Sequence, residues 1–69
     1  MIDVTISTEF ITLSAFLKWA GACETGGEAK IEITEGHTAV NGEVCFMRGK
    51  KLYEGDLVSY NGREYRVTK

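Results

Sequence analysis

The sequence has few of the side chains on which enzymes and metal sites depend. It contains one histidine, His37, and two cysteines, Cys23 and Cys45, which do not form a C-x-x-C pair. Neither G-x-x-x-x-G-K-[ST] nor G-x-G-x-x-G occurs, and no serine has a nucleophile-elbow context. We therefore expect a protein that is not an enzyme and that holds no metal and no cofactor. A disulfide between the cysteines stays open, but two reduced, packed thiols fit better.

Long apolar runs are also missing. None approaches the roughly 20 residues that span a bilayer, and the start MIDVTIST lacks the basic and apolar segments of a signal peptide. Both absences favour a cytoplasmic protein without a membrane partner. The 69 residues predict one small domain, residues 1–69. A chain of this size buries only about 60% of its unfolded surface.

The net charge of −2 conceals an asymmetry along the chain. Residues 1–47 carry two lysines against seven acidic residues, whereas residues 48–69 carry six basic against three acidic residues. Arg48, Lys50 and Lys51 form the densest basic group. On charge alone, ordinary solvated surface lysine is the better interpretation, and a basic region that meets a partner is the alternative.

Two helices are predicted in the first half. An apolar stripe from Leu13 to Ala20 at i, i+3, i+4 and i+7 predicts the first, with Thr12 as N-cap and Gly21 as its stop. The T-x-x-E spacing of a capping box predicts the second over residues 25–35, ending at Gly36. Its apolar positions Ala29 and Ile33 should face the core.

Two Asn-Gly pairs, at 41–42 and 61–62, predict tight type I′ hairpin turns, because both central residues of such turns need φ > 0. Residues 47–51 are expected to form a charged loop, after which Leu52 anchors the chain again. The predicted strands are residues 2–6, 38–40, 43–46, 57–60 and 63–67. These elements define an α+β fold, with two helices packed on a small, mainly antiparallel sheet of about four to five short strands.

The aromatic residues are expected to be mostly interior. Trp19 lies off the apolar stripe of the first helix, where it either packs at the margin of the core or offers a stacking surface. The core interpretation is favoured for Trp19, and also for most of Phe10, Phe16, Phe46 and Tyr53, since they show no stacking pattern.

The order of these elements resembles the S4 RNA-binding domain. The resemblance covers residues 11–60. It rests on the predicted helix that carries Leu13 and Leu17, the segment from Ala29 to Gly36, Val40-Asn41-Gly42, and Gly55-Asp56. The pattern FLKWAG, TGGEAK, VNGE, RGKKL and GD is most similar to small stand-alone bacterial S4-like proteins. The resemblance implies an αL-type RNA-binding motif, in which the helix pair and the following hairpin present a basic face to structured RNA, commonly rRNA or tRNA.

Two positions depart from the family pattern. Thr12 stands where many members have arginine, and Gly26 follows Thr25 where many have arginine. Lys30 matches a position that is often basic. We expect the basic segment 48–51 to lie next to the second helix, near Lys30. The candidate RNA-binding residues are Lys18, Thr25, Gly26, Gly27, Lys30, Arg48, Lys50 and Lys51.

Two functions follow as hypotheses. The first is a non-catalytic module that grips structured RNA, with ribosomal proteins as possible further partners, in ribosome assembly or translation. The second is a protein-interaction adaptor whose acidic helical half binds a ribosomal or replication protein. A cofactor-free enzyme fragment has no sequence feature in its favour.

Overall fold

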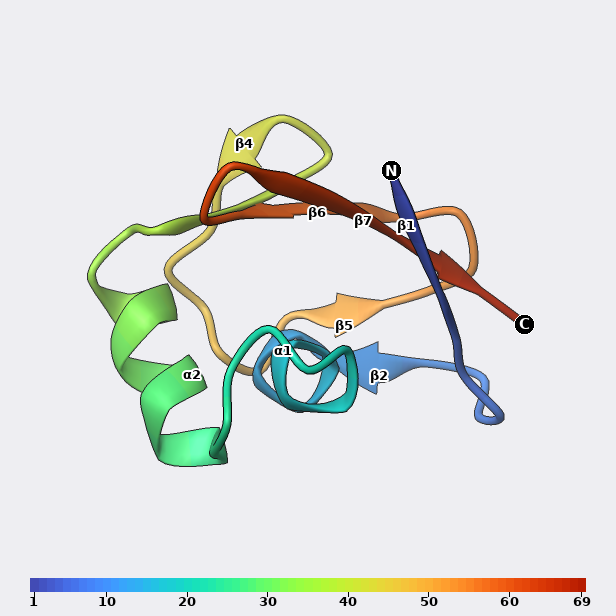
Figure 1. Cartoon of the computed structure of the whole chain (residues 1–69), viewed down its shortest axis with the longest axis horizontal. Helices are drawn as coiled ribbons and strands as arrows, with labels where there is room; N and C mark the ends of the chain where they lie inside the picture. Colours follow the sequence, from blue (N-terminus) through green and yellow to red (C-terminus); the bar gives the residue numbers. More distant parts are fainter.

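In the computed structural model, which describes residues 1–69, two helices lie beneath a five-stranded sheet (Figure 1). The strand order is β1-β7-β6-β3-β4, and all neighbours are antiparallel except β1 and β7. Strands β2 and β5 pair separately beside α1. The elements are β1 (Ile2–Thr5), β2 (Ile11–Thr12), α1 (Leu13–Trp19), α2 (Gly26–Thr34), β3 (Thr38–Val40), β4 (Glu43–Val44), β5 (Lys51–Leu52), β6 (Leu57–Tyr60) and β7 (Arg63–Thr68). The predicted α+β class is confirmed. Neither helix is long and apolar enough to cross a membrane.

Strands β2 and β5 were not predicted. Thr12 was expected only to cap a helix, and Lys51 was placed in a loop. In the structure Thr12 pairs with Lys51, and Ile11 pairs with Leu52, in an antiparallel ribbon. Two-residue strands show no alternation in the sequence, because period two needs at least four residues to be recognised. The pairing depends instead on contacts between segments far apart in the chain.

The first helix begins at the predicted residue but is capped differently. Thr12 occupies the N-cap, yet its side chain makes no capping hydrogen bond. The amides of Leu13 and Ser14 donate instead to the backbone carbonyls of Lys50 and Arg48, at 2.8 and 3.1 Å. These two donors would otherwise lack an intrahelical acceptor. The basic segment therefore serves as the cap of α1.

The second helix follows the sequence prediction closely. Thr25 Oγ1 accepts from the Glu28 amide at 3.0 Å, and Glu28 Oε1 accepts from the Glu24 amide at 3.2 Å. The helix ends at Thr34 with Glu35 as its C-cap, slightly before the predicted end, and the next residue, Gly36, has a φ of 81°, the left-handed conformation that glycine tolerates best. Ala29 and Ile33 are buried, as their spacing indicated.

Both Asn-Gly turns are confirmed. Asn41 and Gly42 have φ values of 51° and 87°, and Asn61 and Gly62 have 53° and 76°. Positive φ at both central residues is the condition for a type I′ turn. The return strand after Gly42 is shorter than predicted, because only Glu43–Val44 pairs with β3.

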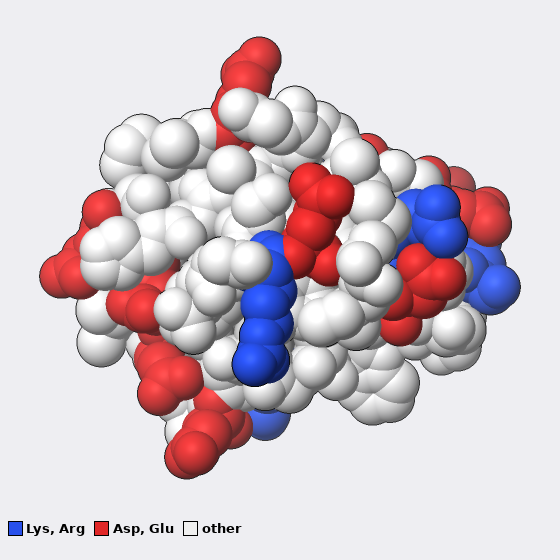
Figure 2. All heavy atoms as spheres, turned by 45° about the horizontal axis from the view of Figure 1, so that its top comes forward, with Lys and Arg blue, Asp and Glu red and all other residues white.

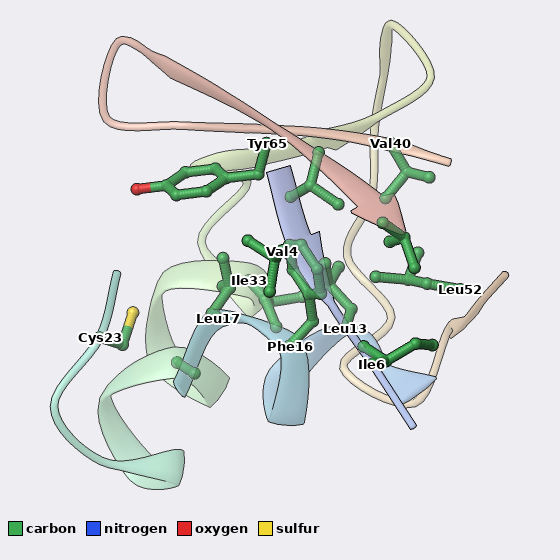
Figure 3. Close-up of a cluster of buried hydrophobic side chains, with 13 residues drawn as sticks. Val4, Ile6, Leu13, Phe16, Leu17, Cys23, Ile33, Val40, Leu52 and Tyr65 are labelled. Carbon is green, nitrogen blue, oxygen red and sulfur yellow. The ribbon is translucent and has the colours of Figure 1, made fainter. Parts of the chain in front are cut away.

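The core lies between the sheet and the two helices (Figure 3). Phe16 is fully buried and meets Tyr65 edge to face, with ring centroids 6.3 Å apart. The predicted inward positions of β7, Tyr65 and Val67, are both buried. The 13 core residues are Val4, Ile6, Leu13, Phe16, Leu17, Cys23, Ala29, Ile33, Val40, Leu52, Val58, Tyr65 and Val67.

Both cysteines are free thiols, as predicted. Cys23 is buried in the core, and burial is the main reason that its pKa is raised above the usual value. Cys45 is half-buried, and its Sγ lies 3.7 Å from the carbonyl of Met47.

The expectation that most aromatic residues are interior is wrong. Only Phe16 among the named group is buried, whereas Phe10 is 38%, Tyr53 47% and Phe46 61% exposed. Trp19 is 66% exposed, so it does not lie at the margin of the core. The helical stripe already placed Trp19 off the buried face of α1, and that geometry outweighs the general tendency of tryptophan to be buried.

Candidate nucleic-acid interface

The basic segment Arg48–Lys51, called here the RGKK segment, is fixed to α1. Its backbone carbonyls at 48 and 50 accept the first two amides of that helix, and Lys51 pairs with Thr12. The sequence placed this segment beside the second helix, near Lys30. The hydrogen bonds that hold it are made to the first helix and to β2 instead, because those amides need acceptors.

The side chains of this segment are available to a ligand. Arg48, Lys50 and Lys51 are all exposed. The two ion pairs in the structure are His37 with Glu32 and Arg66 with Asp3, so no carboxylate neutralises the RGKK segment. A rigid backbone that carries unpaired cations is suited to binding an anion, since less entropy is lost on binding.

Lys18 and Lys30 are also exposed and form no ion pair. Lys18 lies in the last turn of α1, beside Trp19, and Lys30 lies on α2. All five candidate cations therefore lack a carboxylate partner, but they are distributed over three parts of the fold.

Thr25, Gly26 and Gly27 form the exposed N-terminus of α2. The amides of Gly26 and Gly27 make no hydrogen bond. A Cβ at Gly26 would meet nothing within 4 Å, so the protein's own packing does not require glycine there. The Glu28 carboxylate turns back over this helix end, where its charge opposes an incoming anion.

The acidic residues gather on the side of the molecule formed by α2. Figure 2 shows Asp and Glu along the edge where α2 lies in Figure 1, and further acidic side chains beside Lys and Arg at the opposite end. Glu24, Glu28, Glu32 and Glu35 lie on or beside this helix, with Lys30 as its one cation. The α2 side of the surface is thus mainly acidic, whereas the rest of the visible surface carries both signs of charge.

Glu32 links α2 to the sheet. Its Oε1 accepts from the Tyr60 hydroxyl at 2.7 Å, and its Oε2 lies 3.1 Å from His37 Nδ1. The bond from Tyr60 is the main reason that the pKa of Glu32 is lowered, and the same bond raises the pKa of Tyr60. Donor atoms of Glu32, Glu35 and His37 lie within 4.8 Å of one another. Glu32 and His37 already bond to each other, so a contact within the protein explains why these side chains lie close together.

Sequence reasoning missed an aromatic pair beside the RGKK segment. Lys51 Nζ lies 4.9 Å from the centroid of the Phe10 ring, a cation–π distance, and Phe10 lies 6.0 Å from Tyr53. The sequence around Leu52 did contain a signal for this arrangement. In an extended segment side chains alternate between faces, so Lys51 and Tyr53 share the outer face when Leu52 faces inward.

Together, this geometry defines an αL-type α+β domain with exposed cations fixed beside its first helix. The S4 domain family matches residues 4–68, and the chain belongs to this family. It is 46% identical over 59 residues to RlbA of Bacillus subtilis (strain 168), which is named as a probable ribosome maturation protein. That match covers 86% of this chain and 83% of RlbA.

A second relative is YbcJ of Escherichia coli (strain K12), whose name describes an RNA-binding protein. It is 37% identical over 57 residues, which are 83% of this chain and 81% of YbcJ. The solution structure of Escherichia coli YbcJ, described as revealing an αL motif involved in RNA binding, superposes with a TM-score of 0.76 at 31% identity. The superposition covers 100% of this chain and 89% of YbcJ, so the predicted αL fold is confirmed.

A ribosomal protein shares the fold more distantly. The crystal structure of 30S ribosomal protein S4e from Thermoplasma acidophilum superposes with a TM-score of 0.66 at 20% identity. The match covers 87% of this chain but 32% of S4e, and at this identity it shows the fold alone.

Proposed function

We propose that this protein is a non-catalytic, cytoplasmic RNA-binding module that grips structured RNA, of the rRNA or tRNA class, through the phosphate backbone. The observation that carries the proposal is the attachment of the RGKK segment to α1, which holds three unpaired cations on a rigid support. Membership of the S4 domain family and the names of RlbA and YbcJ support it. A role in ribosome assembly or translation fits the same relatives.

The proposed contacts are electrostatic. Lys18, Lys30 and the RGKK segment would bind phosphates, and the N-terminus of α2 from Thr25 to Gly27 would add neutral donors. Phosphate contacts supply most of the affinity of such modules and carry no sequence information. The protein would therefore recognise the shape of folded RNA.

A pair of matched double variants tests this proposal. Lys50→Glu with Lys51→Glu changes the net charge by the same amount as Arg63→Glu with Lys69→Glu, which lies outside the proposed site. Binding to a labelled RNA hairpin is measured by fluorescence anisotropy at fixed salt. We expect the first double variant to lose at least about 10-fold in affinity and the second to lose far less. Equal losses would show that net charge alone governs binding and would refute the proposed site.

The acidic surface of α2 favours a second candidate, an adaptor that binds a basic ribosomal protein. Glu24 and Glu35 test it cleanly, because their side chains make no hydrogen bond in the structure, whereas Glu28 and Glu32 do. If the adaptor function holds, Glu24→Lys with Glu35→Lys abolishes binding to a ribosomal protein fraction, while reversal of Lys50 and Lys51 leaves it intact.

A further inference from the structure

The side chain of Trp19 is fixed in place while most of its surface stays exposed. Its indole Nε1 donates to the Thr5 carbonyl at 2.9 Å, and the residue is 66% exposed. The Ile6 amide of the same peptide unit donates to Thr68 in β7. Because a trans peptide points its N–H and C=O in opposite directions, the Thr5 carbonyl faces the open edge of the sheet. Trp19 thus satisfies an edge carbonyl and is oriented by it.

The exposed ring forms one wall of a groove. A cavity of about 340 Å³ is lined by Ile11, Ala15, Lys18 and Trp19. Ala15 lies one helical turn before Trp19 and contributes only a methyl group, so no large side chain fills the space beside the ring. The groove therefore combines a rigid aromatic wall, a small apolar floor and a cation without a carboxylate partner.

One residue of the groove is linked to the RGKK segment through the pairing of β2 with β5. Ile11, which lines the groove, follows Phe10, and Phe10 lies beneath Lys51 at 4.9 Å. Lys51 in turn pairs with Thr12, the residue after Ile11. Ile11 of the groove thus lies between Phe10 and Thr12 in the chain, while side chains alternate between the two faces of this extended segment.

We propose that this groove binds an unpaired nucleobase of the RNA, stacked on the indole of Trp19, with Lys18 contacting the adjacent phosphate. The inference rests on the proposed function and adds to it a preference for RNA that carries an unstacked nucleotide. A nucleobase fits these observations because an aromatic face and a cation together match its flat ring and its charged linkage. An apolar peptide would leave Lys18 unpaired.

Trp19 is the sole tryptophan, so its fluorescence reports the site directly. The probes are two RNA hairpins with the same stem sequence and the same closed tetraloop. The stem of one is fully paired, and the stem of the other carries a single bulged nucleotide. We expect both hairpins to bind, the bulged one about 10-fold more tightly, and only the bulged one to quench Trp19 emission strongly. Trp19→Ala should remove the 10-fold advantage, and Trp19→Phe should keep part of it because the ring remains.

Two further variants give the test its controls. Lys18→Gln should lower the affinity for the bulged hairpin severalfold without disturbing the ring. Phe46→Ala removes a similarly exposed ring outside the groove and should leave the bulge advantage unchanged. If loss of the Trp19–Thr5 bond prevents Trp19→Ala from folding, the emission of the unaltered protein and Lys18→Gln still decide the question.

The outcomes separate this inference from the proposed function. Equal affinity for the two hairpins, or unchanged Trp19 emission with the bulged one, overturns the nucleobase site while RNA binding stands. Binding of neither hairpin overturns the proposed function and this inference with it.

Discussion

Asn41 and Asp56 are joined side chain to side chain across two turns. Asn41 Nδ2 donates to Asp56 Oδ1 at 3.2 Å, and Asn41 Oδ1 accepts from the Leu57 amide at 2.9 Å. Asp56 Oδ2 accepts from the Tyr53 amide at 2.8 Å. The VNG and GD segments, which are separated in the sequence, thus form one hydrogen-bonded unit that fixes the start of β6 beside the first hairpin.

This unit makes the two asparagine turns unequal in stability. Asn41 and Asn61 share a left-handed backbone and a following glycine, but only the Asn41 side chain makes hydrogen bonds. Both Asn→Ala variants lose the asparagine preference for positive φ, whereas Asn41→Ala also loses two side-chain bonds. We expect Asn41→Ala to cost about 1–3 kcal/mol more than Asn61→Ala in free energy of unfolding, measured by urea denaturation. Equal costs would contradict a stabilising role for the bridge to Asp56.

The Glu32–Tyr60 bond predicts a specific dependence of stability on pH. The pKa of Glu32 is lowered in the folded state, so its contribution is present above the ordinary glutamate pKa of 4.5 and is lost as pH falls through the folded value. Tyr60→Phe removes the main cause of the shift. Urea midpoints measured from about pH 6 down to about pH 3 should fall less for Tyr60→Phe than for the unaltered protein. Tyr53→Phe is the matched control, because the Tyr53 hydroxyl makes no hydrogen bond, and it should keep the full acid sensitivity.

Salt dependence tests the number of phosphate contacts. Four or five such contacts predict a log–log slope of affinity against salt of roughly −3 to −4.5. Lys50→Gln with Lys51→Gln should make the slope less steep by about 1.5, since each phosphate contact contributes about 0.7 to 0.9. Lys69→Gln, outside the proposed site, should leave the slope unchanged. Anisotropy titrations from low to high salt measure it, and a flat salt response would contradict a backbone grip.

The two thiols should react at different rates. Cys45 is half-buried, whereas Cys23 is buried and its pKa is raised, so less of the reactive thiolate is present there. Brief treatment with iodoacetamide followed by peptide mass spectrometry should find Cys45 alkylated well before Cys23. In denaturant the difference should disappear. Equal alkylation of the folded protein would place Cys23 outside the core.

The parts of the fold that the sequence predicted are those with local signals. The capping box at Thr25 and the two Asn-Gly turns depend on residues within four positions of one another, and the structure has each of them. The apolar stripe of α1 also depends on local spacing, and Phe16 within it is buried. These features could be read without knowledge of any distant contact.

The parts that were missed depend on distant contacts. No local pattern shows that Leu13 and Ser14 donate to Lys50 and Arg48, because these residues are more than 30 positions apart. The orientation of the Trp19 indole likewise depends on a bond to Thr5 on another element. The candidate cations were identified from charge and from the family pattern, but the arrangement that relates them to α1 required the structure.

The parallel pairing of β1 with β7 constrains how the chain can fold during synthesis. Ile2 pairs with Tyr65, so β1 can pair only after β7, which follows much later in the chain, has been made. At synthesis rates of about 5–20 residues per second, β1 stays without its partner for several seconds. The burial of Val4 and Ile6 in the folded protein depends on this late pairing. The sheet therefore closes only after β7 has been made, whereas the hydrogen bonds that cap α1 need the chain only as far as Lys50.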